Sequence, residues 1–185
     1  MAIGINICGL NGCGKSTIGR ILADKIGFHF IDNETLFFDP ADDNDPYSKP
    51  RTRSEAENLL LKEVNEHGDF VLSAVKGDYG KEITDIYKLV VVLEVPKNVR
   101  TQRIRNRSFG KFGNRMLPGG DLYESEESFF KMAESRNEEY VESWICTLNC
   151  PVIRIDGTKS IDEIVSLISE RLKSVFKDLR NYEYE

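Results

Sequence analysis

A glycine-rich segment near the start of the sequence has the residue types and spacing of a loop that binds phosphate groups. It reads Gly-Leu-Asn-Gly-Cys-Gly-Lys-Ser from Gly9 to Ser16. Glycines at these positions let backbone N–H groups turn inward around phosphate oxygens, and a helix that follows adds the positive end of its dipole. Lys15 is expected to bridge the β- and γ-phosphates of a nucleotide and to act in catalysis, and the Ser16 hydroxyl is expected to bind Mg²⁺. The sequence therefore predicts ATP and Mg²⁺ as cofactors, with nucleotide contacts from Gly9, Asn11, Gly12, Cys13, Gly14, Lys15, Ser16 and, at the α-phosphate, Thr17.

Such a loop must stand between a strand and a helix. The apolar run 3–8 precedes it, and Ile18, Ile21, Leu22 and Ile26 recur at helical spacing after it. Four further short apolar runs, at 28–31, 70–72, 89–95 and 152–155, predict buried strands that alternate with helical patterns. This alternation predicts an α/β domain over residues 1–185, with a parallel sheet covered by helices on both faces and ligands beyond the carboxyl ends of its strands.

Three helices are predicted in the rest of the chain. Capping boxes at Ser54–Glu57 and Ser160–Glu163 predict the starts of two of them. Apolar residues spaced between 129 and 148 predict one further long helix.

The composition excludes several classes of protein. A net charge of −6 argues against a chain built to hold nucleic acid, and no apolar run approaches the roughly 20 residues that span a bilayer. No signal peptide is visible, and the four cysteines form no metal-type pair. We therefore expect a cytoplasmic protein with a small-molecule partner and with neither a membrane nor a nucleic acid as partner.

The segment 96–115 carries Lys and Arg but no acidic residue. Arg100, Arg103 and Arg107 recur there at helical spacing, and several glycines follow. A basic face near a phosphate loop favours phosphate binding. A solvated basic helix and a nucleic-acid patch are the alternatives.

Three parts of the sequence together carry a resemblance to a known family. They are the loop, the run Leu89-Val-Val-Val-Leu-Glu-Val-Pro96 with Arg103-Ile-Arg-Asn-Arg107 after it, and the segment 151–159. Together they resemble the nucleoside monophosphate kinase group of P-loop proteins, which includes adenylate, shikimate and gluconate kinases. The resemblance implies a five-stranded sheet in the order 2-3-1-4-5 and a mobile lid at about 108–120. It also implies that Arg103 stacks on adenine and that Arg107, with Lys111 or Arg115, neutralises the transferring phosphoryl group. The turn with Gly157 and Lys159 would pass beside the base, or be an ordinary turn before a capped helix.

The acceptor side is expected after the second strand. There Asp32 is the candidate catalytic carboxylate, to orient the acceptor hydroxyl or to hold magnesium through water, with Glu34 as second choice. Capping of a helix by Asp32 or Asn33 is the alternative. Arg51 and Arg53, near Tyr47 in sequence, would suit an anionic acceptor, or be ordinary surface arginines.

After the third strand, Ser73 stands where P-loop proteins place an acidic residue. The run Ser73-Ala74-Val75-Lys76 followed by Tyr79 resembles gluconate kinases. We expect ATP- and Mg²⁺-dependent phosphoryl transfer to a small molecule, first a nucleoside monophosphate and then a sugar acid. A protein that senses ATP without catalysis and a polynucleotide-end kinase are the alternatives. His29 and His67 have no ligand partner at metal spacing in the sequence, so no further metal site is expected.

Overall fold

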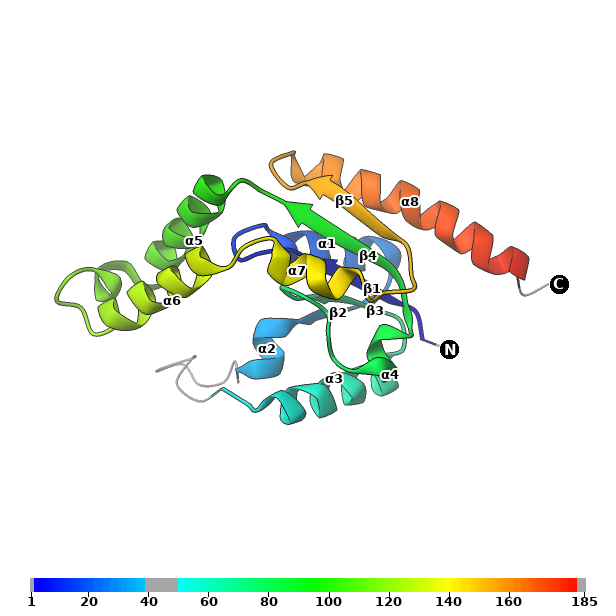
Figure 1. Cartoon of the computed structure of the whole chain (residues 1–185), viewed down its shortest axis with the longest axis horizontal. Helices are drawn as coiled ribbons and strands as arrows, with labels where there is room; N and C mark the ends of the chain where they lie inside the picture. The colour runs from blue at the N-terminus through cyan, green and yellow to red at the C-terminus, as the bar shows by residue number, and fades with distance from the viewer. Residues whose placement is uncertain (1, 39–49, 183–185) are drawn as a thin grey trace.

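The structure is a computed structural model that describes residues 2–38 and 50–182. Its centre is a five-stranded parallel sheet in the order β2-β3-β1-β4-β5 (Figure 1). The strands are β1 (Gly4–Cys8), β2 (His29–Asp32), β3 (Phe70–Ser73), β4 (Tyr87–Glu94) and β5 (Val152–Asp156). The predicted fold class and strand order are confirmed.

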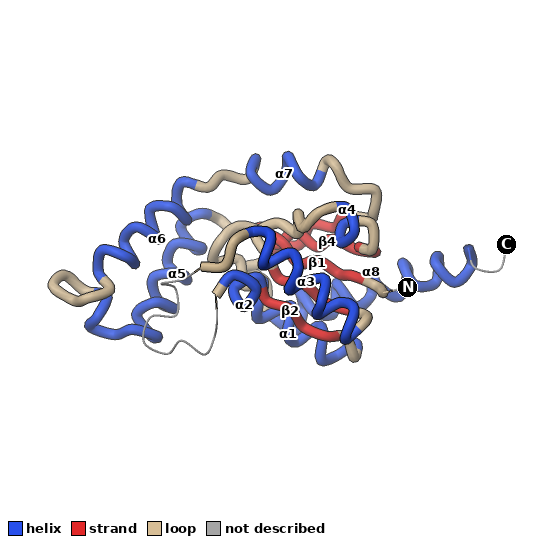
Figure 2. The backbone as a smooth tube through the Cα atoms, turned by 90° about the horizontal axis from the view of Figure 1, so that it is seen from below, coloured by secondary structure: helices blue, strands red, loops and turns tan. Residues whose placement is uncertain are grey.

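Helices cover the sheet and extend beyond it. They are α1 (Lys15–Ile26), α2 (Asn33–Phe37), α3 (Arg53–His67), α4 (Lys81–Thr84), α5 (Lys97–Phe112), the 3-10 helix η1 (Gly113–Met116), α6 (Tyr123–Ser135), α7 (Glu139–Ile145) and α8 (Ile161–Tyr182). Helices α1 and α8 contact each other on one face of the sheet, and α3 and α4 lie on the other (Figure 1). Helices α5 and α6 pack side by side and project away from the sheet (Figures 1 and 2).

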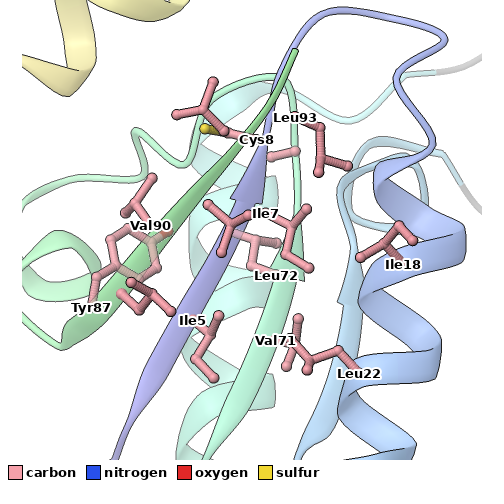
Figure 3. Close-up of a cluster of buried hydrophobic side chains, with 14 of the residues drawn as sticks. Ile5, Ile7, Cys8, Ile18, Leu22, Val71, Leu72, Tyr87, Val90 and Leu93 are labelled. Atoms are coloured by element: carbon pink, nitrogen blue, oxygen red, sulfur yellow. The ribbon is translucent and has the colours of Figure 1, made fainter. Parts of the chain in front are cut away.

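The core forms around central strands that are mainly apolar and are covered on both faces. All residues of β1 and β3 are buried, as expected for parallel strands covered by helices on each side. On one face, Ile18 and Leu22 of α1 approach the side chains of the sheet (Figure 3). A smaller apolar cluster lies between α5, η1 and α6 and contains Ile104, Met116, Phe130 and Ala133.

The prediction of the first capping box was wrong by two residues. Thr52 caps α3: the Glu55 amide donates to Thr52 Oγ1 at 3.3 Å, and the Thr52 amide donates to Glu55 Oε2 at 2.7 Å. The same spacing recurs at Ser54–Glu57, but Ser54 already lies inside the helix, where Glu57 receives a hydrogen bond from Arg53 instead. The box at Ser160–Glu163 is confirmed, because the Glu163 amide donates to Ser160 Oγ just before α8 begins.

The single long helix between 129 and 148 was also a wrong prediction. Helix α6 ends at Ser135, Arg136 is extended (φ −70°, ψ 127°), and α7 begins at Glu139. The apolar residues on either side of the break serve different clusters. Phe130 packs with α5, whereas Trp144 packs into the main core, so one straight helix could not bury both.

The predicted lid begins inside a helix. Helix α5 continues to Phe112, and η1 follows directly, so the first part of segment 108–120 is helical. In the ranges 2–38 and 50–182, no helix combines the length and apolar character needed to cross a membrane.

Candidate active site

The glycine-rich loop joins β1 to α1, as predicted. Gly12 and Gly14 have φ of 86° and 91°, a conformation that side chains disfavour. A Cβ atom on Gly12 would lie 2.5 Å from the Arg100 carbonyl oxygen, so only glycine fits. Gly14 is the N-cap of α1 and has no side chain with which to cap the amide groups of the first turn. The loop thus has the backbone donors and the dipole of an anion site.

Two arginines hold the loop from outside. Arg100 is buried and donates to the Val95 carbonyl at 3.1 Å and to the Asn11 carbonyl at 3.4 Å. Arg136, from the segment between α6 and α7, donates to Asn11 Oδ1 at 2.9 Å. Arg100 therefore supports the loop rather than facing a ligand with Arg103 and Arg107, and Arg136 was not predicted at all.

Lys15 lies back over the loop, where its ammonium donates to the Leu10 carbonyl at 3.0 Å. Removal from water lowers the pKa of Lys15, and the positive charge of Arg107 lowers it further, whereas Asp32 acts in the opposite direction. A bound phosphate would take the place of the Leu10 carbonyl as the hydrogen-bond acceptor of Lys15. Its full negative charge would favour the charged form of Lys15.

A first cavity, of about 330 Å³, lies on the outer side of the loop. It is lined by most of the residues predicted to hold the nucleotide, namely Gly12, Cys13, Gly14, Lys15, Ser16, Thr17, Arg103, Gly157 and Lys159. In the structure Arg103 donates to the Gly157 carbonyl at 3.1 Å, so two of the residues that line this cavity are bonded to each other. Gly9 is absent from its lining: a Cβ atom there would lie 2.6 Å from the Leu93 carbonyl oxygen, so Gly9 permits close packing against β4.

A second cavity, of about 400 Å³, lies between the loop, α2 and the α5–α6 pair. Acids, cations and apolar side chains all contribute to it. Its lining includes Asn11, Asp32, Glu34, Phe38, Ser73, Lys111, Phe112, Glu126, Phe129, Met132 and Arg136. Gly12, Lys15, Ser16 and Arg107 line both cavities, so the two spaces meet at the lysine and serine of the loop.

Asp32 ends β2 and has two roles in the structure. Its Oδ1 accepts a hydrogen bond from the Glu34 amide at 3.0 Å, which caps α2, and the residue also lines the second cavity. The capping alternative is therefore correct for the local structure and is compatible with a position facing a ligand.

Ser73 is buried against α1 at the end of β3. It is 1% exposed, and its hydroxyl donates to the Lys15 carbonyl at 2.9 Å. A Cβ atom on Gly19 would lie 2.3 Å from Ser73 Oγ, which shows how closely α1 approaches β3. The missing acid after β3 is thus accompanied by tight packing of α1 on that strand.

Arg51 and Arg53 are not brought into either cavity. Arg51 donates to the Thr35 carbonyl at 3.0 Å and so ties segment 50–52 to α2. Arg53 donates to Glu57 at 2.8 Å and to the Asp78 carbonyl at 2.6 Å. Tyr47, near them in sequence, lies outside the described residues. Of the two cations in the predicted lid, Lys111 lines the second cavity, whereas Arg115 pairs with Asp121 at 2.7 Å.

Helix α6 supplies cavity residues that sequence reasoning missed. Glu126 is 6% exposed, and within the part of the chain that the structure describes its Oε2 receives no hydrogen bond. The sequence contains a pattern that could have identified Glu126. This residue precedes Phe129 and Phe130 by three and four residues, so a helix places the acid on an apolar face. An isolated acid on such a face is expensive to bury and suggests a ligand.

The sheet order, the loop between β1 and α1, and the adjoining cavities define a P-loop protein with the fold of small-molecule kinases. Residues 5–116 match a family profile described as AAA domain. The chain belongs to this AAA domain family.

Comparison with known proteins agrees with this class. The chain is 30% identical over 178 residues to the uncharacterized protein YqaC of Bacillus subtilis (strain 168), covering 92% of this chain and 97% of that protein. It is 27% identical over 190 residues to a probable gluconokinase of Dictyostelium discoideum, covering 91% and 86%.

Two solved structures share the fold. A gluconokinase from Sinorhizobium meliloti 1021 has a TM-score of 0.58 at 17% identity, covering 99% of this chain and 97% of that one. A deoxyadenosine kinase from M. mycoides has a TM-score of 0.53 at 18% identity, covering 94% and 100%. The resemblance to P-loop small-molecule kinases is thereby confirmed.

Proposed function

We propose that this protein transfers a phosphoryl group from ATP, with Mg²⁺, to a hydroxyl group of a small polyhydroxy acid. One observation carries the proposal: two cavities meet at Gly12, Lys15, Ser16 and Arg107. Phosphoryl transfer needs donor and acceptor on opposite sides of a site rich in positive charge, with the reacting oxygens in line.

The residues present fit ATP and Mg²⁺. The loop leaves space above Gly14, where an added Cβ atom would meet no atom within 4 Å, and the first turn of α1 has no side-chain cap. The first cavity would hold the nucleotide between the loop, Arg103 and the Gly157–Lys159 turn. Ser16 would hold Mg²⁺, which when bound supplies neutralisation of phosphate charge.

Different residues of the chain would have different roles in the reaction. Lys15 and Arg107 stabilise negative charge at the junction of the two cavities, which is the larger part of catalysis in this reaction class. Asp32, at the end of β2, orients the acceptor hydroxyl and accepts its proton as the new bond forms. The helix cap holds its carboxylate in one orientation.

The second cavity favours an acceptor that carries both hydroxyl groups and a negative charge. Arg107, Lys111 and Arg136 supply cations for a carboxylate, and Asp32 and Glu126 supply acceptors for hydroxyl protons. The gluconokinase among the relatives, the gluconokinase fold neighbour and the Ser73–Lys76 run all support a sugar acid over our first expectation, a nucleoside monophosphate.

A nucleoside or nucleoside monophosphate is the second candidate. Phe38, Phe129 and Met132 line the same cavity and could contact a base, and the deoxyadenosine kinase shares the fold.

The test is a coupled measurement of ADP release from ATP and Mg²⁺. The panel contains gluconate and related hydroxy acids, shikimate, nucleosides and nucleoside monophosphates. A signal with sugar acids alone supports the proposal, and a signal with nucleosides or their monophosphates alone replaces the acceptor class. If the protein binds ATP but no acceptor causes ADP release, the proposal of a kinase is overturned and an ATP-sensing protein is favoured.

A further inference from the structure

We propose a divalent transition-metal site, with Zn²⁺ as the ion to test, formed by His29, Glu63 and His67 on the edge of the sheet away from the phosphate loop. It goes beyond the proposed function and does not depend on it. Sequence reasoning found no partner for either histidine. The structure overturns that expectation, because residues 34 positions apart meet where α3 packs on β2 (Figure 2).

The three side chains converge on one point. His29 Nε2 lies 2.8 Å from Glu63 Oε2, and His67 Nε2 lies 3.7 Å from the same oxygen. One ligand atom from each residue lies within 4.8 Å of the others. Two ligands on a tetrahedral zinc ion, with bonds of about 2.0–2.1 Å, are about 3.3 Å apart, so the observed separations lie on either side of that value.

The backbone already holds these ligands in place. Glu63 and His67 lie one turn apart on α3, and the Gly68 amide ends the helix by donating to the Val64 carbonyl at 2.8 Å. His29 opens β2, and its amide donates to the Asp69 carbonyl at 2.9 Å. The two imidazole rings are stacked, with centroids 3.9 Å apart and planes inclined by 18°. Because an imidazole binds a metal in the plane of its ring, the two rings would rotate out of this stack for both Nε2 atoms to point at a single ion.

The ligand types select the metal. Two imidazoles and one carboxylate suit Zn²⁺ and its neighbours among the first-row metals, whereas Mg²⁺ prefers oxygen ligands and retains water. The three side chains are between 30% and 41% exposed, so an ion can enter from solvent and keep water as a fourth ligand. The metal would replace the direct contact between His29 and Glu63 and would link the edge strand β2 to α3.

The site is separate from the candidate active site. His29 and Asp32 stand at opposite ends of β2, about 10 Å apart along the strand. Loss of the metal should therefore weaken the fold around β2 and leave nucleotide binding at the loop intact.

Isothermal titration of tag-free full-length protein with Zn²⁺, in excess Mg²⁺, tests the proposal. We expect one ion per chain in the wild type and in Glu66→Gln, a control on the same helix outside the cluster. His67→Ala and Glu63→Gln should bind about tenfold more weakly or worse. Circular dichroism without metal checks that each variant is folded, and Glu63→Gln preserves the side-chain shape should His67→Ala be unstable.

A second readout identifies the ligands. The chain has two histidines, so ¹⁵N-histidine labelling gives two imidazole systems, and both should shift when Zn²⁺ is added. Co²⁺ should give the visible bands of a tetrahedral site without a thiolate-to-cobalt band. Unshifted imidazoles, a thiolate band from a cysteine, or equal affinity in all variants would overturn the site.

Discussion

The buried Oε2 of Glu126 leads to a prediction in which stability and function move in opposite directions. Replacing Glu126 by Met keeps the side-chain length and removes the charge. A buried polar atom left without a hydrogen bond costs about 1–3 kcal/mol. Glu126 is 6% exposed, and no group in residues 2–38 and 50–182 donates a hydrogen bond to its Oε2. We expect the free energy of unfolding of Glu126→Met to equal that of the wild type or exceed it by about 1–3 kcal/mol.

The same change should weaken binding of the acceptor. A hydrogen bond to a charged group is worth about 1.5–3 kcal/mol, so losing the bond between Glu126 and an acceptor hydroxyl should raise KM by about 10- to 150-fold. ATP affinity should not change, because Glu126 lines only the second of the two cavities.

The assay pairs urea unfolding with acceptor-dependent ADP release, using the acceptor found in the panel. Glu127→Met is the matched control, because Glu127 is next on α6 but pairs with Arg105 at the surface at 2.9 Å. It should leave KM unchanged and lower stability by about 1 kcal/mol or less. An unchanged KM in Glu126→Met would remove Glu126 from the acceptor site. A loss of stability beyond about 2 kcal/mol would show that the carboxylate has a partner in the fold.

The remaining predictions concern the loop, the junction of the cavities and the buried thiol. Lys15→Met should lower turnover and nucleotide affinity sharply, measured with a fluorescent ATP analogue; undiminished values for both would refute the loop assignment. Arg107→Ala should reduce kcat by about 10³-fold with a smaller change in ATP binding, because charge stabilisation of the transferring group is the larger part of this catalysis. Asp32→Asn should reduce kcat while preserving stability, since asparagine also caps helices; a collapse of ATP affinity would assign Asp32 to the nucleotide site. Burial raises the pKa of the Cys8 thiol to about 12, so at pH 8 about one molecule in ten thousand carries the reactive thiolate. Iodoacetamide at pH 8 should therefore modify exposed Cys146 well before Cys8, with labelling of Cys8 rising as pH rises, and mass spectrometry of the peptides would detect the reverse order.

The sequence predicted the features that depend on local chemistry. The loop was found because its glycines, lysine and serine lie within eight residues, and the strands were found because parallel strands buried on both faces are short apolar runs. The capping box of α3 was misplaced because two copies of the same spacing occur two residues apart, and only packing selects Thr52.

Long-range features were missed for the opposite reason. Arg136 reaches Asn11 across 125 positions of sequence, and His29 reaches Glu63 across 34. No local pattern records such pairs, because strand order and helix packing bring them together. Arg51 and Arg53 are close in sequence, and for that reason we expected them to bind an anionic acceptor together. In the structure each bonds to a different part of the protein.

The position of Asp32 gives a reason for the serine at the end of β3. Asp32 and Ser73 are register partners on neighbouring parallel strands, about 4.8 Å apart. A carboxylate at position 73 would have to fit where Ser73 already contacts the Lys15 carbonyl and lies against Gly19, and it would stand beside a second carboxylate. Two like charges at that distance would oppose each other's ionisation. A small hydroxyl on β3 lets α1 approach the sheet and leaves Asp32 as the acid at the end of these two strands, where its charge acts on Lys15. The departure from the usual pattern after β3 is thus compatible with the proposed catalysis, in which Asp32 on the neighbouring strand would supply the carboxylate.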